Sequence, residues 1–451
     1  MGGRWNGWCW LRSALIRRVV RIGRRLGLNE STEVMVSEGK SDVNRRSFLG
    51  LGAGALAVAA LANVGADGQS KETMQKGQQD HSASNPGPAN KPLAGESPSS
   101  EVPPITDKGD VAPFWYSFDL SHRRTQEGGW TRQVTQRDLP ISTDLAGVNM
   151  RLTAGSYREL HWHTANEWAY MIYGKARVTV LNPDGTIFID DVEKGDLWFF
   201  PAGFPHSIQG IGEDGCEFLL VFDEGLFSEY QTFLISDWVA HTPASVLAKN
   251  FKLPQSQLAG LPEDELYIFP GKVPGSLEQD REAVGGKAVE SPVSYTFRML
   301  KMPATKETSG GSARIVDSRN FPASKTIAAA LVTVKPGALR ELHWHPNASE
   351  WQYYLSGSGR MTVFASSGKA RTMNFTANDV GFVPAVAGHY IENTGDSDLV
   401  FLEVFKTSHY EDFSLNNWIR RVPPEMATAH LNLSESELKG IPSEKLVVIA
   451  E

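Results

Sequence analysis

Two histidine pairs with the same spacing occur in the chain. His161 and His163 form the first pair, and His343 and His345 form the second. Residues i and i+2 of a β-strand point to the same side of the sheet, so each pair can direct two imidazoles into one cavity. Neutral imidazole is a common metal ligand. The spacing therefore indicates two metal sites.

A carboxylate and a third histidine complete each set. Glu167 follows the first pair where the chain can turn, and His206 follows the turn Pro201–Gly203, which places it on a second hairpin. Glu350 and His389 repeat this order in the second half. Three imidazoles and one carboxylate occupy four positions of an octahedral metal and leave two for small molecules. Such mixed ligation suits manganese, iron, cobalt or nickel.

The alternative is that these histidines are hydrogen-bonded core residues, which is the commoner role of a lone histidine in an apolar strand. The same four residue types recur in the same order, however, and this argues against coincidence. The candidate ligands are His161, His163, Glu167 and His206 in the first set and His343, His345, Glu350 and His389 in the second.

The two ligand sets belong to an internal repeat. Arg158–His163 recurs as Arg340–His345 at an offset of 182 residues, and His206 recurs as His389 at an offset of 183. Short alternating or apolar runs, separated by Gly, Pro, Asp and Asn, fill each half. This pattern favours antiparallel β-structure closed as a barrel or jelly roll. We therefore expect an all-β fold of two tandem barrels with short helical appendages.

Length and composition agree with this organisation. A chain of 451 residues has room for two or three domains, and 41% hydrophobic with 21% charged residues is ordinary globular composition. We expect the domains over residues 111–275 and 276–451. The net charge is −8, and residues 67–451 hold 34 Lys and Arg against 48 Asp and Glu. An acidic body argues against a nucleic-acid partner. The two cysteines make no disulfide framework.

Residues 1–66 have the features of a targeting segment. Arg45 and Arg46 precede an apolar run over 51–64 that ends in small residues. This arrangement resembles a twin-arginine export signal and predicts a periplasmic or extracellular protein. A membrane anchor is the alternative, but the run is shorter and richer in Gly and Ala than a typical spanning helix. We therefore expect no membrane span after processing. Residues 67–110, polar and rich in Ser, Pro and Gly, predict a flexible linker.

Two stretches around the ligands resemble the bicupin oxalate decarboxylases. They are Gly155–Glu167 and Phe200–Ser207, together with their copies in the second half. The resemblance covers about residues 112–451. It includes an asymmetry of this family, because the glutamate stands four residues after the second histidine in the first set but five residues after it in the second set.

The resemblance implies a fold, a reaction and cofactors. Each half would be a cupin barrel, a double-stranded β-helix, that holds one manganese ion. Enzymes of this family convert oxalate to formate and carbon dioxide, and they require dioxygen as a co-substrate without consuming it. The family also implies a homo-oligomer, a trimer or a hexamer.

Arg158 and Arg340 are the residues that the resemblance assigns to oxalate binding, with Arg158 polarising the substrate. Their guanidinium groups can hold a carboxylate by two parallel hydrogen bonds. Each arginine stands three residues before the first histidine ligand. An ideal strand would point it to the opposite side, so we expect a bend that brings it to the metal. A surface or interdomain salt bridge is the alternative role.

Two further acids are candidate catalytic residues. Glu229, in the segment Phe227–Phe233, matches the proton donor on the lid of this family, although Tyr230 and Gln231 are larger than the residues usual there. Glu229 could instead begin a short surface helix. Glu403 occupies a position where the family also has a glutamate, and it could instead orient a ligand or an arginine.

Three other functions compete with oxalate decarboxylation. An oxalate oxidase would share the metal site and the substrate but lack the lid acid, and would produce carbon dioxide and hydrogen peroxide. A bicupin dioxygenase for another organic acid would show a different substrate range. A non-catalytic metal-binding bicupin, such as a storage protein, would be expected to lack some ligands, whereas both sets here are complete.

Overall fold

The computed structural model describes residues 87–228, 231–285 and 291–451. The expected export signal (1–66), the linker up to residue 86 and the candidate acid Glu229 lie outside the described residues. The described residues belong to one compact unit, Met74–Glu451. Within them, no helix combines the length and the apolar composition that crossing a membrane requires.

The first barrel is built from one large antiparallel sheet that curls on itself. Its strand order is β11-β5-β9-β6-β10-β4-β3-β2, with β12 beside β5 and with β7 and β8 beside β6. The strands are β2 (Arg124–Gln126), β3 (Gly129–Val134), β4 (Ala146–Leu152), β5 (Tyr157–His163), β6 (Glu167–Leu181), β7 (Ile187–Glu193), β8 (Leu197–Phe200), β9 (His206–Gly210), β10 (Cys216–Phe222), β11 (Thr232–Leu234) and β12 (Ile268–Phe269).

The long strand β6 closes this barrel. Its first part pairs with β8 and β10, and its second part pairs with β7 and β9, so one strand serves both halves of the barrel. Gly174 lies at the change of direction with a φ of 75°. A side chain there would meet the carbonyl oxygen of Gly215 at 2.1 Å, so only glycine fits this corner.

The second barrel has two sheets. Their strand orders are β1-β21-β18-β23-β16-β15-β14 and β20-β19-β22-β17-β24, with β25 beside β17. The strands are β1 (Trp115–Ser117), β14 (Lys306–Thr308), β15 (Gly311–Val316), β16 (Ala328–Val334), β17 (Leu339–Trp344), β18 (Glu350–Ser356), β19 (Ser358–Phe364), β20 (Ala370–Thr376), β21 (Asp379–Val383), β22 (Gly388–Asn393), β23 (Leu399–Phe405), β24 (Phe413–Ser414) and β25 (Val448–Ile449).

Each barrel takes one short strand from the segment that leads into the other. β1 precedes the first barrel in the chain but pairs with β21 of the second. β13 (Thr296–Phe297), which precedes the second barrel, pairs with β8 of the first. One apolar core continues across both barrels and includes Trp168 and Trp351. The expected fold of two tandem β-barrels is confirmed, and the exchange of strands adds a connection that the repeat did not reveal.

Part of the expected linker makes ordered contacts. Helices α3 (Lys91–Glu96) and α4 (Pro98–Glu101) are followed by a backbone bridge between Lys108 and Ala370. The Asp107 carboxylate accepts hydrogen bonds from the backbone and side chain of Thr372 at 2.7 Å. β20 lies at the edge of its sheet and offers backbone groups to this segment, which differs from the flexible tether expected from composition alone.

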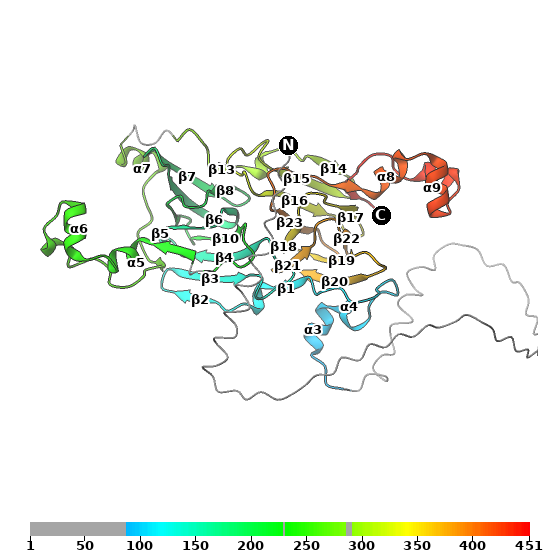
Figure 1. Cartoon of the computed structure of the whole chain (residues 1–451), viewed down its shortest axis with the longest axis horizontal. Coiled ribbons are helices and arrows are strands. Elements are labelled where there is room, and N and C mark those ends of the chain that lie inside the picture. Colours follow the sequence, from blue (N-terminus) through cyan, green and yellow to red (C-terminus); the bar gives the residue numbers. More distant parts are fainter. Residues whose placement is uncertain (1–86, 229–230, 286–290) are drawn as a thin grey trace, which may run out of the picture. The chain divides into compact units, whose positions relative to one another are not determined.

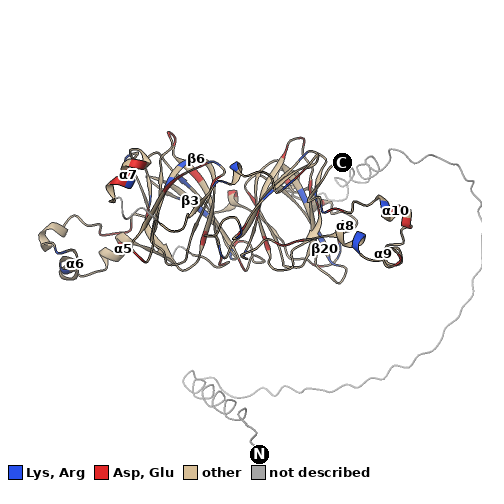
Figure 2. Ribbon diagram, turned by 90° about the horizontal axis from the view of Figure 1, so that it is seen from above, with Lys and Arg blue, Asp and Glu red and all other residues tan. Residues whose placement is uncertain are grey.

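The helices are few and short. α5 and α6 extend from the first barrel, and α8 and α9 extend from the second (Figure 1). Acidic and basic residues stand next to one another on α7 (Figure 2), where Asp280 forms an ion pair with Arg177 at 2.6 Å. The remaining bounds are α5 (Ile235–Ala240), α6 (Ala244–Phe251), α7 (Leu277–Ala283), α8 (Leu415–Arg421), α9 (Pro424–Leu431) and α10 (Glu435–Gly440).

Candidate metal centres and active site

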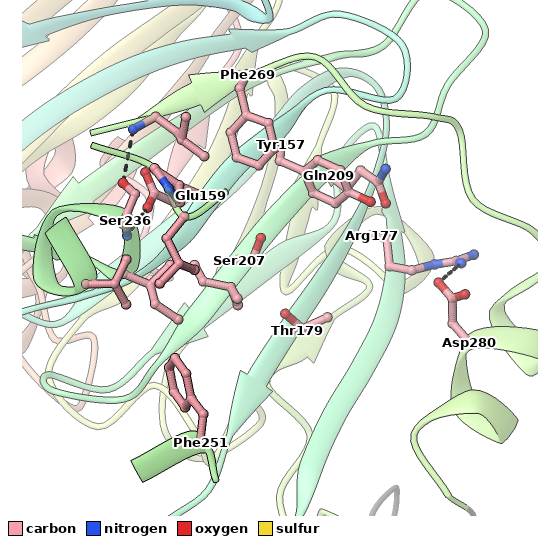
Figure 3. A pocket seen from close by; sticks show the side chains of 16 residues that line it. Tyr157, Glu159, Arg177, Thr179, Ser207, Gln209, Ser236, Phe251, Phe269 and Asp280 are labelled. Atoms are coloured by element: carbon pink, nitrogen blue, oxygen red, sulfur yellow. Dashed lines mark hydrogen bonds and ion pairs between the residues drawn. The ribbon is translucent and has the colours of Figure 1, made fainter. Parts of the chain in front are cut away.

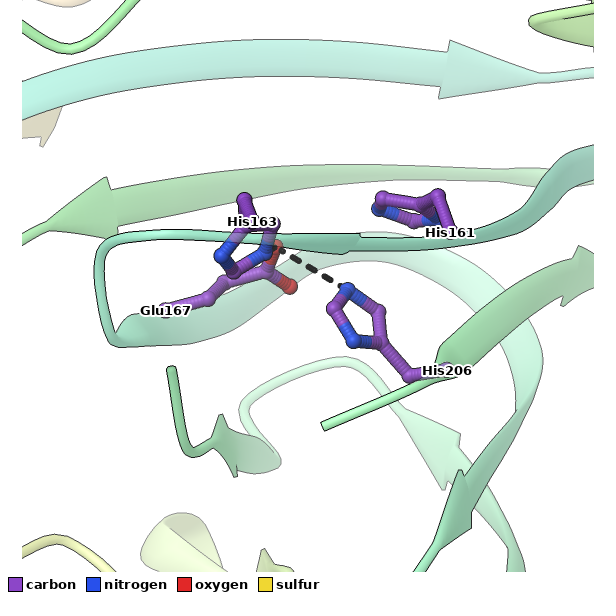
Figure 4. A group of neighbouring side chains, drawn as sticks. All are labelled: His161, His163, Glu167 and His206. Atoms are coloured by element: carbon purple, nitrogen blue, oxygen red, sulfur yellow. Dashed lines mark hydrogen bonds and ion pairs between the residues drawn. The ribbon is translucent and has the colours of Figure 1, made fainter. Parts of the chain in front are cut away.

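The first barrel brings four metal-ligand side chains to one point. His161 and His163 come from β5, Glu167 begins β6 and His206 begins β9 (Figure 4). One donor atom from each lies within 4.8 Å of the others, and all four side chains are buried. The second barrel groups its four equivalents in the same way, within the same distance. The structure thus assembles both candidate ligand sets.

The histidines are oriented as metal ligands. In each, Nδ1 lies within hydrogen-bond distance of a backbone carbonyl, so Nδ1 carries the hydrogen and Nε2 presents its lone pair to the centre. The Nε2 atoms of His206, His343 and His345 are buried and have no hydrogen-bond partner among the described residues, which fits an atom reserved for a cation. The Nδ1 to carbonyl distances are 2.5 Å for His161, 2.6 Å for His163, 2.7 Å for His206, 2.6 Å for His343, 2.8 Å for His345 and 3.0 Å for His389.

The electrostatics of the first centre suit a divalent cation. Burial lowers the pKa of His161 well below its ordinary value, and burial together with the nearby His163 lowers the pKa of His206 to about 3. Burial alone would raise the pKa of Glu167, but the hydrogen bond with His163 and the nearby imidazoles lower it. Near neutral pH His161 and His206 are therefore neutral while Glu167 is charged, as metal ligands must be.

Different residues form a hydrogen bond with Oε1 of the ligand glutamate in the two barrels. Trp198 donates from its indole nitrogen to Oε1 of Glu167 at 2.9 Å. In the second barrel Gln352 donates to Oε1 of Glu350 at 2.6 Å and accepts from the hydroxyl of Tyr354 at 2.7 Å. Such partners orient a ligand and tune its basicity. Trp198 comes from β8, a strand whose pairing the sequence does not specify, whereas Gln352 stands two residues after Glu350 on β18. No motif shared by the two halves marks either residue.

A β-bulge brings Arg158 to the metal side of the sheet. Between Arg158 and His161, strand β5 has one more residue than its partner β9, so the register shifts there. The expected bend is therefore present, and Arg158 lines the same cavity as the three ligands His161, His163 and Glu167. Its side chain is 4% exposed. β17 carries the same shift between its arginine and its first histidine.

The cavity at the first centre is small, and both polar and apolar side chains line it. Its volume is about 20 Å³, which is room for about one water molecule. Phe227 and Thr232, on either side of the undescribed Glu229 and Tyr230, both line it. The remaining lining residues are Thr131, Gln133, Val148, Met150, Arg158, His161, His163, Glu167, Leu220, Phe222 and Tyr267.

Arg340 of the second barrel is held by the protein's own groups. The side chain is fully buried and donates to Glu403 at 3.0 Å, to the hydroxyl of Tyr410 at 2.8 Å and to Asp412 at 3.2 Å. Burial raises the pKa of Glu403 to about 7, although the charge of Arg340 opposes this shift. The oxalate-binding role of Arg340 and the catalytic role of Glu403 stay predictions.

The surroundings of the two arginines differ in sequence as well. Leu220 stands at the position of Glu403, and the connection from Phe222 to Phe233 is three residues longer than that from Phe405 to Phe413. The ligand sets are alike, but the first barrel alone has the longer segment with Ser228 before Glu229.

Trp162 and Trp344, which separate the paired ligands, face away from the metals. Trp162 stacks on Phe233 with ring centroids 5.5 Å apart and meets Trp238 edge-on at 5.5 Å. Trp344 is tilted against Phe413 and meets Trp418 edge-on, with ring centroids 5.5 Å apart in both pairs. Trp238 is 64% exposed and Trp418 is 58% exposed. Each barrel thus carries an exposed aromatic cluster behind its metal centre.

Comparisons with known proteins agree with the duplicated site. The Cupin family model matches residues 117–258 and 297–439. The chain is 54% identical over 354 residues to the oxalate decarboxylase OxdC of Bacillus subtilis, which covers 78% of this chain and 91% of that protein. It is 40% identical over 425 residues to an oxalate decarboxylase of Arthroderma benhamiae, with 87% and 98% covered.

A solved structure gives the same result. It belongs to work on the Mn(II) centres of the Bacillus subtilis oxalate decarboxylase and superposes with a TM-score of 0.79 at 53% identity. The match covers 81% of this chain and 96% of that one. The chain is therefore a member of the cupin family and, within it, of the bicupin oxalate decarboxylases.

Proposed function

We propose that this protein decarboxylates oxalate to formate and carbon dioxide at a manganese centre in its first barrel. The observation that carries the proposal is the position of Arg158, a buried cation in the same cavity as His161, His163 and Glu167. The activity of relatives at 54% and 40% identity supports it. The reaction consumes one proton for each oxalate, so the site needs an acid near the carbon that becomes formate.

The ligand residues hold manganese, which when bound supplies positive charge to an oxalate oxygen and one-electron redox chemistry. Arg158 binds a carboxylate of oxalate through its guanidinium and orients it. The apolar walls, including Leu220, Phe222 and Phe227, exclude water and strengthen these charge interactions. Dioxygen is the further co-substrate, and the second barrel binds a second manganese ion.

Glu229 is the proton donor of this proposal. Oxidation of oxalate needs no proton at carbon, whereas formation of formate does, so the acid decides between the two products. Phe227 and Thr232 border the cavity on either side of its position in the chain, which supports its access to the substrate. Desolvation would raise the pKa of a carboxyl group in such a site and let it accept and return a proton.

Product analysis tests the proposal. The purified protein, loaded with manganese and supplied with oxalate and air, should release formate and carbon dioxide in equal amounts. Metal-free protein is the control and should release neither. Hydrogen peroxide as the sole reduced product would identify an oxalate oxidase instead, and no turnover by manganese-loaded protein would favour a non-catalytic bicupin.

The protein is proposed to act as an exported homo-oligomer, a trimer or a hexamer. The exposed aromatic clusters around Trp162 and Trp344 support association between copies, since large exposed apolar surfaces often mark interfaces. Light scattering of the purified protein tests this, and a monomeric mass would contradict it. Export through the twin-arginine route stays a proposal that rests on Arg45 and Arg46, the apolar run over 51–64 and the small residues that end it.

A further inference from the structure

Glu159 is a buried carboxylate of the metal-bearing strand that is not a ligand. It lies between Arg158 and the first histidine ligand on β5, and it is 2% exposed. Because of the bulge, Arg158 points into the metal cavity while Glu159 lines a different cavity of about 580 Å³, where its carboxylate lies beside Ser236 (Figure 3). A buried carboxylate needs hydrogen-bond donors to offset its desolvation.

Two backbone amides supply these donors. Ser236 donates its N–H to Oε1 of Glu159 at 2.7 Å, and Tyr267 donates its N–H to Oε2 at 2.8 Å. The hydroxyl of Ser236 in turn accepts from the backbone N–H of Leu266 at 3.1 Å. The carboxylate therefore joins three separate parts of the chain, namely β5, the start of α5 and the segment before β12. Hydrogen bonds to an ionised acceptor are the strong ones.

Tyr267 is the residue through which Glu159 reaches Arg158. Its φ of 56° is a left-handed conformation, costly for tyrosine, and it is held by reciprocal bonds because the backbone N–H of Glu159 donates to the Tyr267 carbonyl at 3.0 Å. The same carbonyl accepts from Arg158 at 3.2 Å, and the Arg158 guanidinium lies 4.1 Å from the centre of the Tyr267 ring.

Ser236 connects Glu159 to the other side of the cavity. It follows β11 after one residue, and β11 pairs Thr232 with His163 and Leu234 with His161. Thr232 lines the cavity on the C-terminal side of the position of Glu229. The backbone carbonyl of Glu159 also accepts from Nδ1 of His161 at 2.5 Å. Glu159 thus forms hydrogen bonds with Tyr267, which contacts Arg158, with the metal ligand His161, and with Ser236, which follows β11.

We propose that Glu159 is a positioning residue for the decarboxylation, an inference that rests on the function proposed above. It acts through Tyr267, which contacts the Arg158 guanidinium, and through Ser236, which follows the strand β11 that pairs with the ligand strand β5. A displacement of about an ångström at either group is enough to slow an enzyme strongly.

The second barrel offers a matched control. Glu341 accepts from the hydroxyl of Ser414 at 2.7 Å and from the backbone N–H of Val447 at 3.0 Å. Val447 also has a left-handed φ, 68°, but it has no ring to place against Arg340. The support is therefore similar, with a serine hydroxyl in place of one backbone amide, and the arginine beside it is held by other side chains. Loss of Glu341 should affect the fold of its barrel and leave oxalate binding in the first barrel unchanged.

The test compares Glu159→Gln with Glu341→Gln in the full-length, manganese-loaded protein. Glutamine keeps the size, but only its carbonyl oxygen can accept, so one of the two amide bonds is lost. We expect Glu159→Gln to raise KM for oxalate about tenfold and to lower the fraction of oxalate converted to formate, with unchanged manganese content. Hydrogen exchange at the amides of Ser236 and Tyr267 should accelerate. Glu341→Gln should keep KM within about twofold of the wild type.

Each outcome decides the inference. Unchanged KM and product ratio in folded Glu159→Gln, or equal changes in both variants, would overturn it. If Glu159→Gln does not accumulate in folded form, Glu159→Asp replaces it, because the shorter acid keeps the charge but cannot reach both amides, and a KM equal to the wild type would again overturn it. A wild-type protein that makes no formate in the same assay would refute the proposed function instead.

Discussion

Nε of Arg340 lies 3.0 Å from Oε1 of Glu403, and neither side chain is exposed to solvent. The second carboxylate oxygen, Oε2, has no hydrogen-bond partner among the described residues. The described part of the first barrel has no such ion pair at the equivalent position, because Leu220 is the counterpart of Glu403. A buried pair of this kind is stable only while both partners are present, since each charge alone is poorly solvated.

Glu403→Leu should therefore lower the free energy of unfolding by about 3 kcal/mol or more, because it leaves Arg340 with one fewer compensating charge. Urea denaturation followed by circular dichroism measures this. The double variant Arg340→Met with Glu403→Leu should recover only part of the loss, because Asp412 then loses Arg340 as a partner. A single variant as stable as the wild type would contradict the prediction, and loss of formate production by folded, manganese-loaded Glu403→Leu would instead support the catalytic role predicted for Glu403.

Arg158→Lys should reduce kcat/KM for oxalate about a hundredfold. Lysine keeps the positive charge but loses the planar group that binds a carboxylate by two hydrogen bonds and packs on Tyr267. Steady-state formate assays measure the effect, with metal analysis of the same sample to show that manganese is retained. Arg151→Lys, a partly buried arginine that pairs with Asp214 outside the metal cavity, is the control and should retain full activity. A loss below about threefold would remove Arg158 from the substrate site.

Glu229→Gln should suppress formate while oxalate oxidation continues. The amide keeps the size of the side chain but cannot give a proton at the required step, so the ratio of hydrogen peroxide to formate should rise by at least about tenfold. Both products are measured in the same reaction. Glu213→Gln, which removes an exposed acid outside this segment, is the control and should keep the product ratio of the wild type. Formate output equal to the wild type would exclude Glu229 as the donor.

The metal-free protein should lose stability in acid. Burial lowers the pKa of His206 to about 3 and that of His161 in the same direction, while both return to about 6.5 on unfolding. The unfolded state then binds more protons, so this stability is complete above about pH 6.5 and is lost as pH falls toward 3. The slope should be about 1.4 kcal/mol per pH unit for each such histidine. Denaturant titrations at several pH values measure it, and His206→Gln should have a shallower slope.

Arg45→Lys with Arg46→Lys should leave the protein inside the cell. Twin-arginine signals require the arginine pair, and lysine preserves the charge without the recognised side chain. Cell fractionation with an antibody against the folded body measures the distribution. Substitution of Arg24 and Arg25, outside the pair, is the control and should leave export unchanged. Normal export of the first variant would reject this route.

The ligands could be predicted from the sequence because their geometry is local. The two-residue spacing of His161 and His163 places both side chains on one side of β5. The internal repeat has the same spacing at His343 and His345, which makes coincidence improbable. The same reasoning led to two β-barrels, since strand length and turn residues are properties of short segments.

Other parts of the site depend on contacts between distant segments. The carboxylate of Glu167 accepts from Trp198 on β8, whereas Glu350 accepts from Gln352 on its own strand, so the repeat does not indicate the distant partner. The bulge before His161 was needed to place Arg158 but has no signature of its own in the sequence. Tyr267 reaches Arg158 across more than a hundred residues, and only a folded chain reveals that contact.

Because β1 pairs with β21 and β13 pairs with β8, each barrel needs a strand from the other half of the chain. Each half of the duplicated chain contributes one strand to the barrel of the other half. A fragment that ends between the barrels would therefore expose an unpaired strand edge and aggregate readily. The two halves should therefore melt together in a single calorimetric transition, and they are no longer separable modules.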